Sequence, residues 1–219
     1  MKSILVFGRR LQGKTTLGFH LAKSLRLTVV AFDPNDQLSV GNVVADIESV
    51  RSNLATEEWL TVFRPRVAVD VEDEFHELAR MLLDYTDFTL LVDEASLLQS
   101  AGFADHYLNE FVRRSRGINL IQTLHRPSDA AKICRAMATD WYLFATTDPA
   151  DLGAIAEQCG DEVAEAASKL EAKHFVHCEL PARTFEISGN PSAWYESLNA
   201  VPFEVDLSQV LEVPSHAVQ

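Results

Sequence analysis

A glycine-rich segment close to the first residue has the residue types and spacing that bind phosphate. Residues 8–15 read GRRLQGKT and match the pattern G-x-x-x-x-G-K-[ST] at every fixed position. Gly8 and Gly13 let the backbone approach an anion closely, because neither has a Cβ. In loops of this pattern the lysine, here Lys14, reaches the β- and γ-phosphates, and the hydroxyl that follows, here Thr15, ligates Mg²⁺.

The neighbouring segments would position this loop for phosphate. Residues 3–7 form a short apolar run, as in a buried strand, and residues 15–25 carry apolar side chains at helical spacing. A loop between a strand and a helix points successive N–H groups at an anion, and the helix N-terminus adds positive potential. The sequence therefore predicts a nucleotide site with the candidates Gly8, Arg9, Arg10, Leu11, Gln12, Gly13, Lys14, Thr15 and Thr16.

Two carboxylates follow another apolar run. Residues 88–92 read FTLLV and lead directly into Asp93 and Glu94. If this strand lies parallel to residues 3–7, both strands end at the same edge of one sheet. We then expect Asp93 to complete the Mg²⁺ site and Glu94 to orient a water at the γ-phosphate. The alternative interpretation is an N-cap pair at the start of a short helix over residues 94–100.

A basic cluster and a histidine are further candidates. Arg113, Arg114 and Arg116 form the densest positive cluster of a chain whose net charge is −13. They are either a solvated helix end or a source of an arginine for the γ-phosphate of a neighbouring subunit, which raises rates about 10³- to 10⁵-fold in enzymes that use one. His125 follows a predicted strand over residues 118–124. It either senses the γ-phosphate through a hydrogen bond or is a histidine of the core.

Charge and composition exclude several classes of protein. The 219 residues include 19 Lys and Arg against 32 Asp and Glu, so the surface as a whole repels nucleic acid. Any DNA contact must therefore be local, or be assembled from several subunits. Three cysteines without a CxxC spacing argue against a disulfide framework and against a zinc site. No apolar stretch reaches the ~20 residues of a membrane span, so we expect a cytoplasmic protein that does not insert into membranes.

Strand-like and helix-like segments alternate along the chain, which is typical of a mostly parallel sheet flanked by helices. The predicted strands are residues 3–7, 27–32, 88–92, 118–124 and 141–145. The predicted helices are residues 15–25, 72–85, 107–116 and 128–138, followed by helical patterns over 149–170. Residues 174–180 and 183–187 predict a terminal β-hairpin. Residues 43–63 fit neither pattern well and are mostly left unassigned.

Several segments together resemble the FtsK–HerA superfamily of DNA-pumping ATPases. They are GRRLQGKT at 8–15, FTLLVDEA at 88–95, RRSRG at 113–117, INLIQTLHRPSD at 118–129 and LFATTDPADLGAI at 143–155. The resemblance covers residues 1–180. It implies a RecA-like P-loop NTPase core with an extra strand between the P-loop strand and the strand before Asp93. It also implies ATP and Mg²⁺ as cofactors, and translocation of double-stranded DNA by a homo-oligomeric, hexameric ring.

The same resemblance assigns roles to individual residues. Arg114 or Arg116 matches the interface arginine of the superfamily, and the alignment does not choose between them. His125 stands in a TQRP-like segment where the superfamily usually has Gln. The implied catalytic candidates are Lys14, Glu94, Arg114, Arg116 and His125, and the implied metal ligands are Thr15 and Asp93.

Within the superfamily the chain most resembles the compact genome-packaging ATPases of membrane-containing viruses, which implies a capsid or vertex partner and association with the virion. We predict an ATPase domain over residues 1–188 and an acidic tail over residues 189–219, which lacks Lys and Arg and packs on the domain or on a partner. Two other functions stay open: an assembly or secretion ATPase of the filamentous-phage type, and a nucleotide-dependent switch without motor activity.

Overall fold

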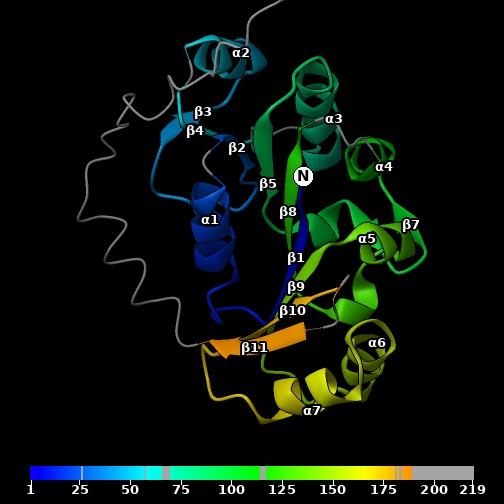
Figure 1. The fold of residues 1–219 in the computed structure, drawn as a ribbon. Helices are drawn as coiled ribbons and strands as arrows, with labels where there is room; N and C mark the ends of the chain where they lie inside the picture. Colours follow the sequence, from blue (N-terminus) through cyan, green and yellow to red (C-terminus); the bar gives the residue numbers. More distant parts are fainter. Residues whose placement is uncertain are drawn as a thin grey trace, which may run out of the picture.

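The computed structural model describes residues 1–25, 27–56, 58–65, 70–113, 117–180, 182 and 184–188, and in this part the chain forms a nine-stranded sheet (Figure 1). The strands are β1 (Ser3–Phe7), β2 (Thr28–Phe32), β3 (Asn42–Val44), β4 (Leu60–Phe63), β5 (Phe88–Val92), β8 (Asn119–Leu124), β9 (Asp140–Phe144), β10 (Phe175–Glu179) and β11 (Thr184–Ser188). Their order across the sheet is β11-β10-β9-β1-β8-β5-β2-β4-β3. The strands from β9 to β3 are parallel, and β10 pairs antiparallel with both β9 and β11. The predicted α/β fold and its terminal hairpin are therefore confirmed.

Helices cover both faces of this sheet. Helix α1 (Lys14–Ser24) lies on one face, and most of the other helices lie on the opposite face (Figure 1). The remaining helices are α2 (Ile47–Ala55), α3 (Val71–Leu82), α4 (His106–Arg113), α5 (Lys132–Met137), α6 (Pro149–Cys159) and α7 (Asp161–Lys169). The residues Ala95–Leu97 and Pro127–Asp129 form short 3₁₀ turns, and β6 (Gln99–Ser100) pairs with β7 (Phe103–Ala104) in a small separate hairpin.

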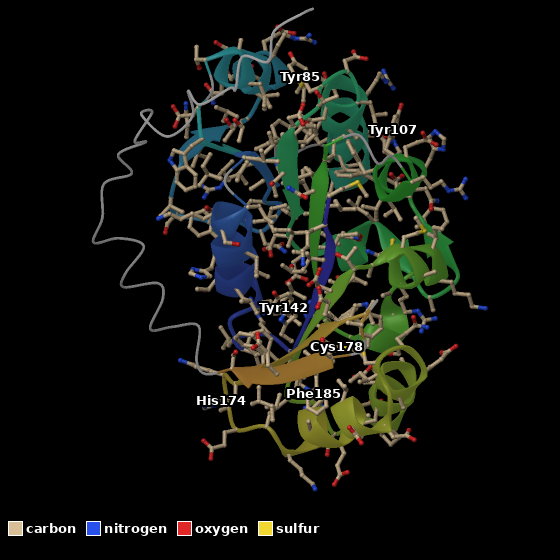
Figure 2. The ribbon with its side chains drawn as sticks, viewed as in Figure 1. Tyr85, Tyr107, Tyr142, His174, Cys178 and Phe185 are labelled. Carbon is tan, nitrogen blue, oxygen red and sulfur yellow. The ribbon has the colours of Figure 1, made fainter. Side chains whose placement is uncertain are left out.

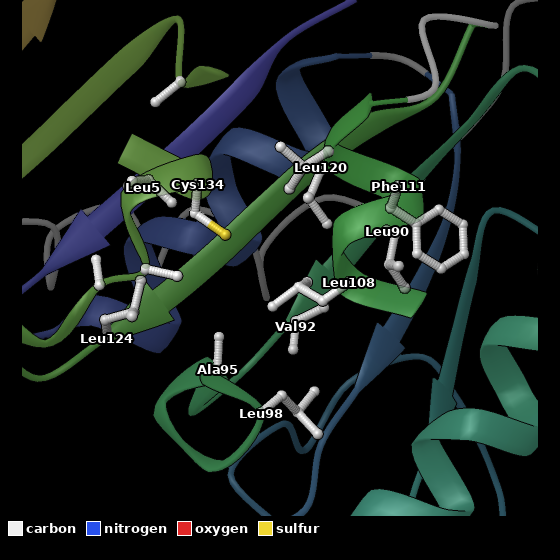
Figure 3. Close-up of a cluster of buried hydrophobic side chains, with 14 of the residues drawn as sticks. Leu5, Leu90, Val92, Ala95, Leu98, Leu108, Phe111, Leu120, Leu124 and Cys134 are labelled. Atoms are coloured by element: carbon white, nitrogen blue, oxygen red, sulfur yellow. The ribbon is translucent and has the colours of Figure 1, made fainter. Parts of the chain in front are cut away.

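The central strands are continuous apolar runs because helices cover them on both sides. Every residue of β1 and of β5 is buried. Successive side chains enter opposite apolar clusters, so that Leu5 and Leu90 belong to one cluster and Leu91 to the other. Figure 3 shows the first cluster, where Phe111 of α4 and Cys134 of α5 pack toward the strands. This rigid double layer fixes the positions of the strand ends, and the polar residues of the site follow those ends.

Three segments differ from the sequence-based expectation. Residues 42–63 contain β3, α2 and β4. The pattern missed β3 and α2 because β3 is mostly exposed and α2 buries only Val50, so neither has a strong apolar period. The helical pattern over 149–170 is two helices, since Gly160 has a φ of 105° and interrupts the first. The helix expected over 128–138 begins only at Lys132, because extended backbone at Ala130 and Ala131 separates it from the preceding 3₁₀ turn.

Two further expectations concern composition. Cys134, Cys159 and Cys178 are buried, the last of them on β10 (Figure 2), and burial raises the pKa of Cys134 to about 11. None of the helices among the described residues combines the length and the apolar character needed to cross a bilayer. The predicted acidic tail, residues 189–219, lies outside the described residues.

Candidate nucleotide site

The loop between β1 and α1 depends on its two glycines for different reasons. A Cβ on Gly8 would lie 2.9 Å from Phe144 and 2.8 Å from Gln12, which is closer than packed atoms allow. Gly13 has a φ of 103°, in the left-handed region that side chains disfavour. The Gly8 N–H donates to the Leu124 carbonyl at 3.1 Å, so the first residue of the loop continues the pairing between β1 and β8.

Gln12 supports the loop from inside. Its side chain accepts a hydrogen bond from the Arg9 N–H and donates one to the Ala145 carbonyl at 3.2 Å. The loop is thereby tied to the end of β9 before any ligand binds. Of the predicted nucleotide-binding residues, Gln12 therefore shapes the cradle, whereas Arg10, Leu11 and others line the cavity itself.

Lys14 is almost completely buried in the loop. Its side chain curls back so that Nζ lies 3.3 Å from the Arg9 carbonyl oxygen. Burial lowers the pKa of Lys14, and the nearby carboxylates of Glu94 and Asp93 oppose that effect. A buried ammonium with one long carbonyl contact is suited to exchange that contact for phosphate oxygens.

Asp93 lies directly against the loop. It is 1% exposed, and its Oδ1 accepts hydrogen bonds from Thr15 Oγ1 at 3.0 Å and from Thr123 Oγ1 at 2.7 Å. Burial raises the pKa of Asp93, against the hydrogen bonds of Thr123 and Thr15. Its Oδ2 is buried and has no hydrogen-bond partner among the described residues. A buried carboxylate with an unpartnered oxygen beside a threonine hydroxyl fits Mg²⁺, which prefers such oxygen ligands.

Glu94 is held from two directions. Its backbone N–H donates to Thr123 Oγ1 at 3.0 Å, and its φ of 52° turns the chain sharply after β5. Its carboxylate lies 2.7 Å from His125 Nε2. The side chain does not cap the 3₁₀ turn that follows, so the alternative interpretation as an N-cap is not supported. Glu94 and His125 follow the carboxyl ends of β5 and β8, which are neighbouring parallel strands.

Thr123 is a residue that the sequence reasoning missed. Its hydroxyl donates to Asp93 and accepts from the Glu94 N–H, so it joins the two positions from the neighbouring strand. The signal was weak, since Thr123 is one of three polar residues in the predicted strand over 118–124. The resemblance implied a strand between β1 and β5, and β8 occupies that place, but nothing in the sequence singled out Thr123.

Lys14, Thr15 and Glu94 border a cavity of about 310 Å³ at the carboxyl edge of the sheet, whereas Asp93 lies behind Thr15 and does not line it. The P-loop supplies most of its lining, and Glu94 lies on the side of β5. Two lining residues were not expected, Gln37 from the segment after β2 and Lys173 from the turn between α7 and β10. The volume falls at the lower end of the range for small-molecule sites, and the lining is cationic where a polyphosphate would lie.

The segments after β8 and β9 brace each other beside the site. Arg126 pairs with Asp148 at 2.8 Å and with Asp151 at 3.2 Å, and Ser128 Oγ donates to Asp151 at 2.8 Å. Thr146 also donates to Asp151, which is 4% exposed. The two sequence segments that carry much of the family resemblance therefore contact each other, and their bonds fix the loop that bears His125.

The structure describes the residues on either side of Arg114 and Arg116, which themselves fall outside the described residues. Arg113 ends α4, and Gly117 leads into the first residues of β8. Gly117 is therefore at the amino edge of the sheet, about 15 to 20 Å from the edge where the P-loop lies.

The fold and the cavity together are those of a P-loop NTPase in which β8 separates the P-loop strand from the strand before Asp93. One similar solved structure is the genome packaging NTPase B204 from Sulfolobus turreted icosahedral virus 2 in complex with AMPPCP, with 21% identity, a TM-score of 0.72, and coverage of 86% of this chain and 97% of that chain. VirB4 of Thermoanaerobacter pseudethanolicus has 10% identity, a TM-score of 0.62, and coverage of 89% and 91%.

A third similar structure is the pCW3 conjugation coupling protein TcpA with ATPγS, at 17% identity and a TM-score of 0.56, where the match covers 90% of this chain and 65% of that one. No protein-family model and no curated protein sequence matches the chain. The structural likenesses confirm the predicted RecA-like fold.

Proposed function

We propose that the protein is an ATP-hydrolysing motor that moves double-stranded DNA, in the manner of a viral genome-packaging ATPase. The observation that carries the proposal is the hydrogen-bonded group of Thr15, Asp93 and Thr123, which brings the P-loop and the acidic strand end within reach of one magnesium-bound triphosphate. The likeness to a genome packaging NTPase and to a conjugation coupling protein supports the motor class.

In this proposal each residue has a separate task. Lys14 binds the phosphates, and Thr15 and Asp93 hold Mg²⁺, which when bound neutralises charge on the β- and γ-phosphates. Glu94 orients the attacking water and accepts its proton. His125 positions the Glu94 carboxylate through the contact at 2.7 Å. It takes the place of the amide that the superfamily usually has there.

The same proposal explains how an acidic chain could act on DNA. A monomer of net charge −13 has no general attraction for the phosphate backbone, so the contact would come from loops gathered in a ring. A ring also brings the basic segment before β8 toward the cavity of a neighbouring subunit, where Arg114 or Arg116 contacts the γ-phosphate. A capsid or vertex protein would recruit the ring, which would place the protein with the virion.

Glu94→Gln tests the assignment of the water-activating carboxylate. The amide keeps the size and the contact with His125 but cannot accept a proton, so we expect turnover to fall by about 10²-fold or more while ATP binding persists. The paired control is Glu110→Gln, a half-buried carboxylate on α4, on the face of the sheet opposite α1. Unchanged turnover in Glu94→Gln would remove Glu94 from this role.

The DNA substrate is tested separately. ATPase rates are measured without DNA and with duplexes of increasing length, with the total concentration of base pairs held constant. For a translocase, the stimulation of ATP turnover rises with duplex length and then levels off. On a longer duplex the motor spends a smaller fraction of its time binding to and leaving the DNA. Turnover that does not respond to duplex DNA would contradict the translocase and leave the two other functions, a nucleotide-dependent switch and an ATPase stimulated by a protein partner.

An assembly or secretion ATPase of the filamentous-phage type is a second candidate, because it would use the same P-loop and the same carboxylates after β5. An ATPase of that class would be stimulated by a protein partner rather than by duplex DNA. The DNA-length experiment therefore distinguishes the two candidates.

A further inference from the structure

The nucleotide cavity has a cation that belongs to neither the P-loop nor the acidic strand end. Lys173 lines the cavity together with Arg10 and Lys14, although it lies in the turn between α7 and β10. Figure 1 shows this turn at the same end of the sheet as the loop between β1 and α1. No sequence motif drew attention to this lysine, because the turn lies more than a hundred residues from the P-loop.

The strand order tells which part of a nucleotide Lys173 would meet. β1 lies between β8 and β9, so Glu94 after β5 and Lys173 before β10 stand on opposite sides of the P-loop strand. The γ-phosphate must lie toward Asp93 and Glu94, where the metal ligand and the water-activating carboxylate are. A nucleotide held by the P-loop therefore extends its α-phosphate and nucleoside toward β9 and β10, on the side of Lys173.

The backbone at this lysine supports a role for its side chain. Lys173 has a φ of 64°, in the left-handed region that is unfavourable for a residue with a Cβ. Leu11 in the P-loop has a similar φ of 66°. Residues held in such conformations cluster at ligand sites, and glycine would satisfy the same turn without strain.

We propose that Lys173 binds the α-phosphate of the nucleotide, as a cationic contact independent of Lys14. This inference rests on the nucleotide site proposed above. The α-phosphate is common to ATP, ADP and AMP, whereas the β- and γ-phosphates that Lys14 binds are not. Lys173 thus adds affinity for all three nucleotides and takes no part in the hydrolysis step.

The test compares Lys173→Gly with wild type by equilibrium dialysis of radiolabelled ATP, with ADP and AMP as competitors. We expect the Kd of all three nucleotides to rise about 5- to 10-fold, as for loss of one partly exposed charge-assisted hydrogen bond. We expect kcat at saturating ATP to stay within about 2-fold of wild type. The Tm should be equal to or higher than that of wild type, because glycine relieves the left-handed backbone.

Two further variants complete the experiment. Lys173→Arg keeps the positive charge and should bind nucleotide like wild type. Lys169→Ala removes a cation one turn earlier, on α7, where it pairs with Glu165, and should leave nucleotide binding unchanged. Lys14→Ala is the reference for loss of the main phosphate contact. We expect it to weaken the binding of ATP and ADP more than that of AMP.

The inference is overturned if Lys173→Gly binds all three nucleotides like wild type, if its defect is confined to ATP, or if affinity and Tm fall together. Those results would mean, respectively, no contact, a contact with the γ-phosphate, or a structural role. Failure of the wild-type chain to bind nucleotide, or normal binding by Lys14→Ala, would instead refute the proposed nucleotide site itself.

Discussion

At the residue scale, one hydroxyl does much of the positioning in the site. Thr123 donates to Asp93 and accepts from the Glu94 N–H, so it uses both capacities of its oxygen. It is 0% exposed and lies on a strand held between β1 and β5. The positions of the metal-binding and the water-activating carboxylates are thus fixed relative to each other by a side chain that contacts neither phosphate nor water in our proposal.

Thr123→Val should separate this positioning from nucleotide binding. The methyl group fills the same space, but the Glu94 N–H loses its acceptor, so we expect a loss of about 1 to 3 kcal/mol in the free energy of unfolding. We expect kcat to fall about 10-fold and the Kd for ATP to change little, because the P-loop is untouched.

A matched control exists in the same sheet. Thr61 on β4 is also 0% exposed, and its hydroxyl has no hydrogen-bond partner among the described residues. Thr61→Val should therefore leave the free energy of unfolding unchanged or raise it, and leave turnover unchanged. Equal effects of the two substitutions in urea unfolding and steady-state assays would contradict the role given to Thr123.

At the element scale, polar contacts join the strands where the sheet changes from parallel to antiparallel. Asp140 at the start of β9 is 1% exposed and accepts hydrogen bonds from Lys2, Thr139 and His177. Burial opposes ionisation of Asp140, but these hydrogen bonds prevail and lower its pKa to about 2. The hydrogen bond to Asp140 raises the pKa of His177, with a smaller contribution from Glu186 on β11.

This cluster predicts how stability depends on pH. The contribution of Asp140 is present above its ordinary pKa near 3.9 and is lost as the pH falls toward about 2. The contribution of protonated His177 is fully present below its ordinary pKa near 6.5 and is lost as the pH rises through the higher pKa of the folded protein. Both contributions are present together between about pH 4 and 6.5.

His177→Gln tests the upper limit of that window. We expect it to lower the free energy of unfolding in urea by about 1 kcal/mol at pH 5.5 and by clearly less at pH 9, where the wild-type histidine is neutral. His174→Gln is the control, since the His174 Nδ1 lies 3.3 Å from a backbone carbonyl oxygen rather than beside Asp140. A difference that grows toward pH 9 would have the wrong sign and would reject the assignment.

At the scale of the whole molecule, the proposal places the cavity and the arginine that serves it on different subunits. The P-loop and Glu94 are at the carboxyl edge of the strands, and Gly117, which follows the basic segment in the sequence, precedes β8 at the amino edge. Neighbouring copies arranged head to tail would bring these two edges together, because a heterologous contact places opposite edges of two subunits side by side.

Mixing two inactive variants tests this arrangement. Lys14→Ala removes the phosphate contact, and the double variant Arg114→Ala with Arg116→Ala removes both candidate arginines. If the arginine acts across an interface, an equal mixture should recover about a quarter of wild-type turnover, because that share of interfaces pairs an intact cavity with an intact arginine. Recovery is measured after subunit exchange, with unmixed variants as controls. No recovery in a ring shown to exchange subunits would reject action in trans.

The sequence by itself determined the local chemistry. GRRLQGKT between an apolar strand and an amphipathic helix predicts the phosphate loop, and FTLLV before Asp93 and Glu94 predicts a buried strand that ends in carboxylates. These predictions depend on residue spacing within about ten residues. Over that distance the geometry of a helix, strand or turn fixes which side chains lie on the same face. The alternation of such segments also predicted a mostly parallel sheet flanked by helices.

Only the tertiary structure decided which distant residues meet. Thr123 reached Asp93 because β8 lies between β1 and β5, and Lys173 reached the cavity because β10 turns back beside β9. The contact of His125 with Glu94 likewise joins two strand ends. Strand order depends on how the apolar faces of all the helices and strands fill one core, and no local pattern in the sequence records that packing.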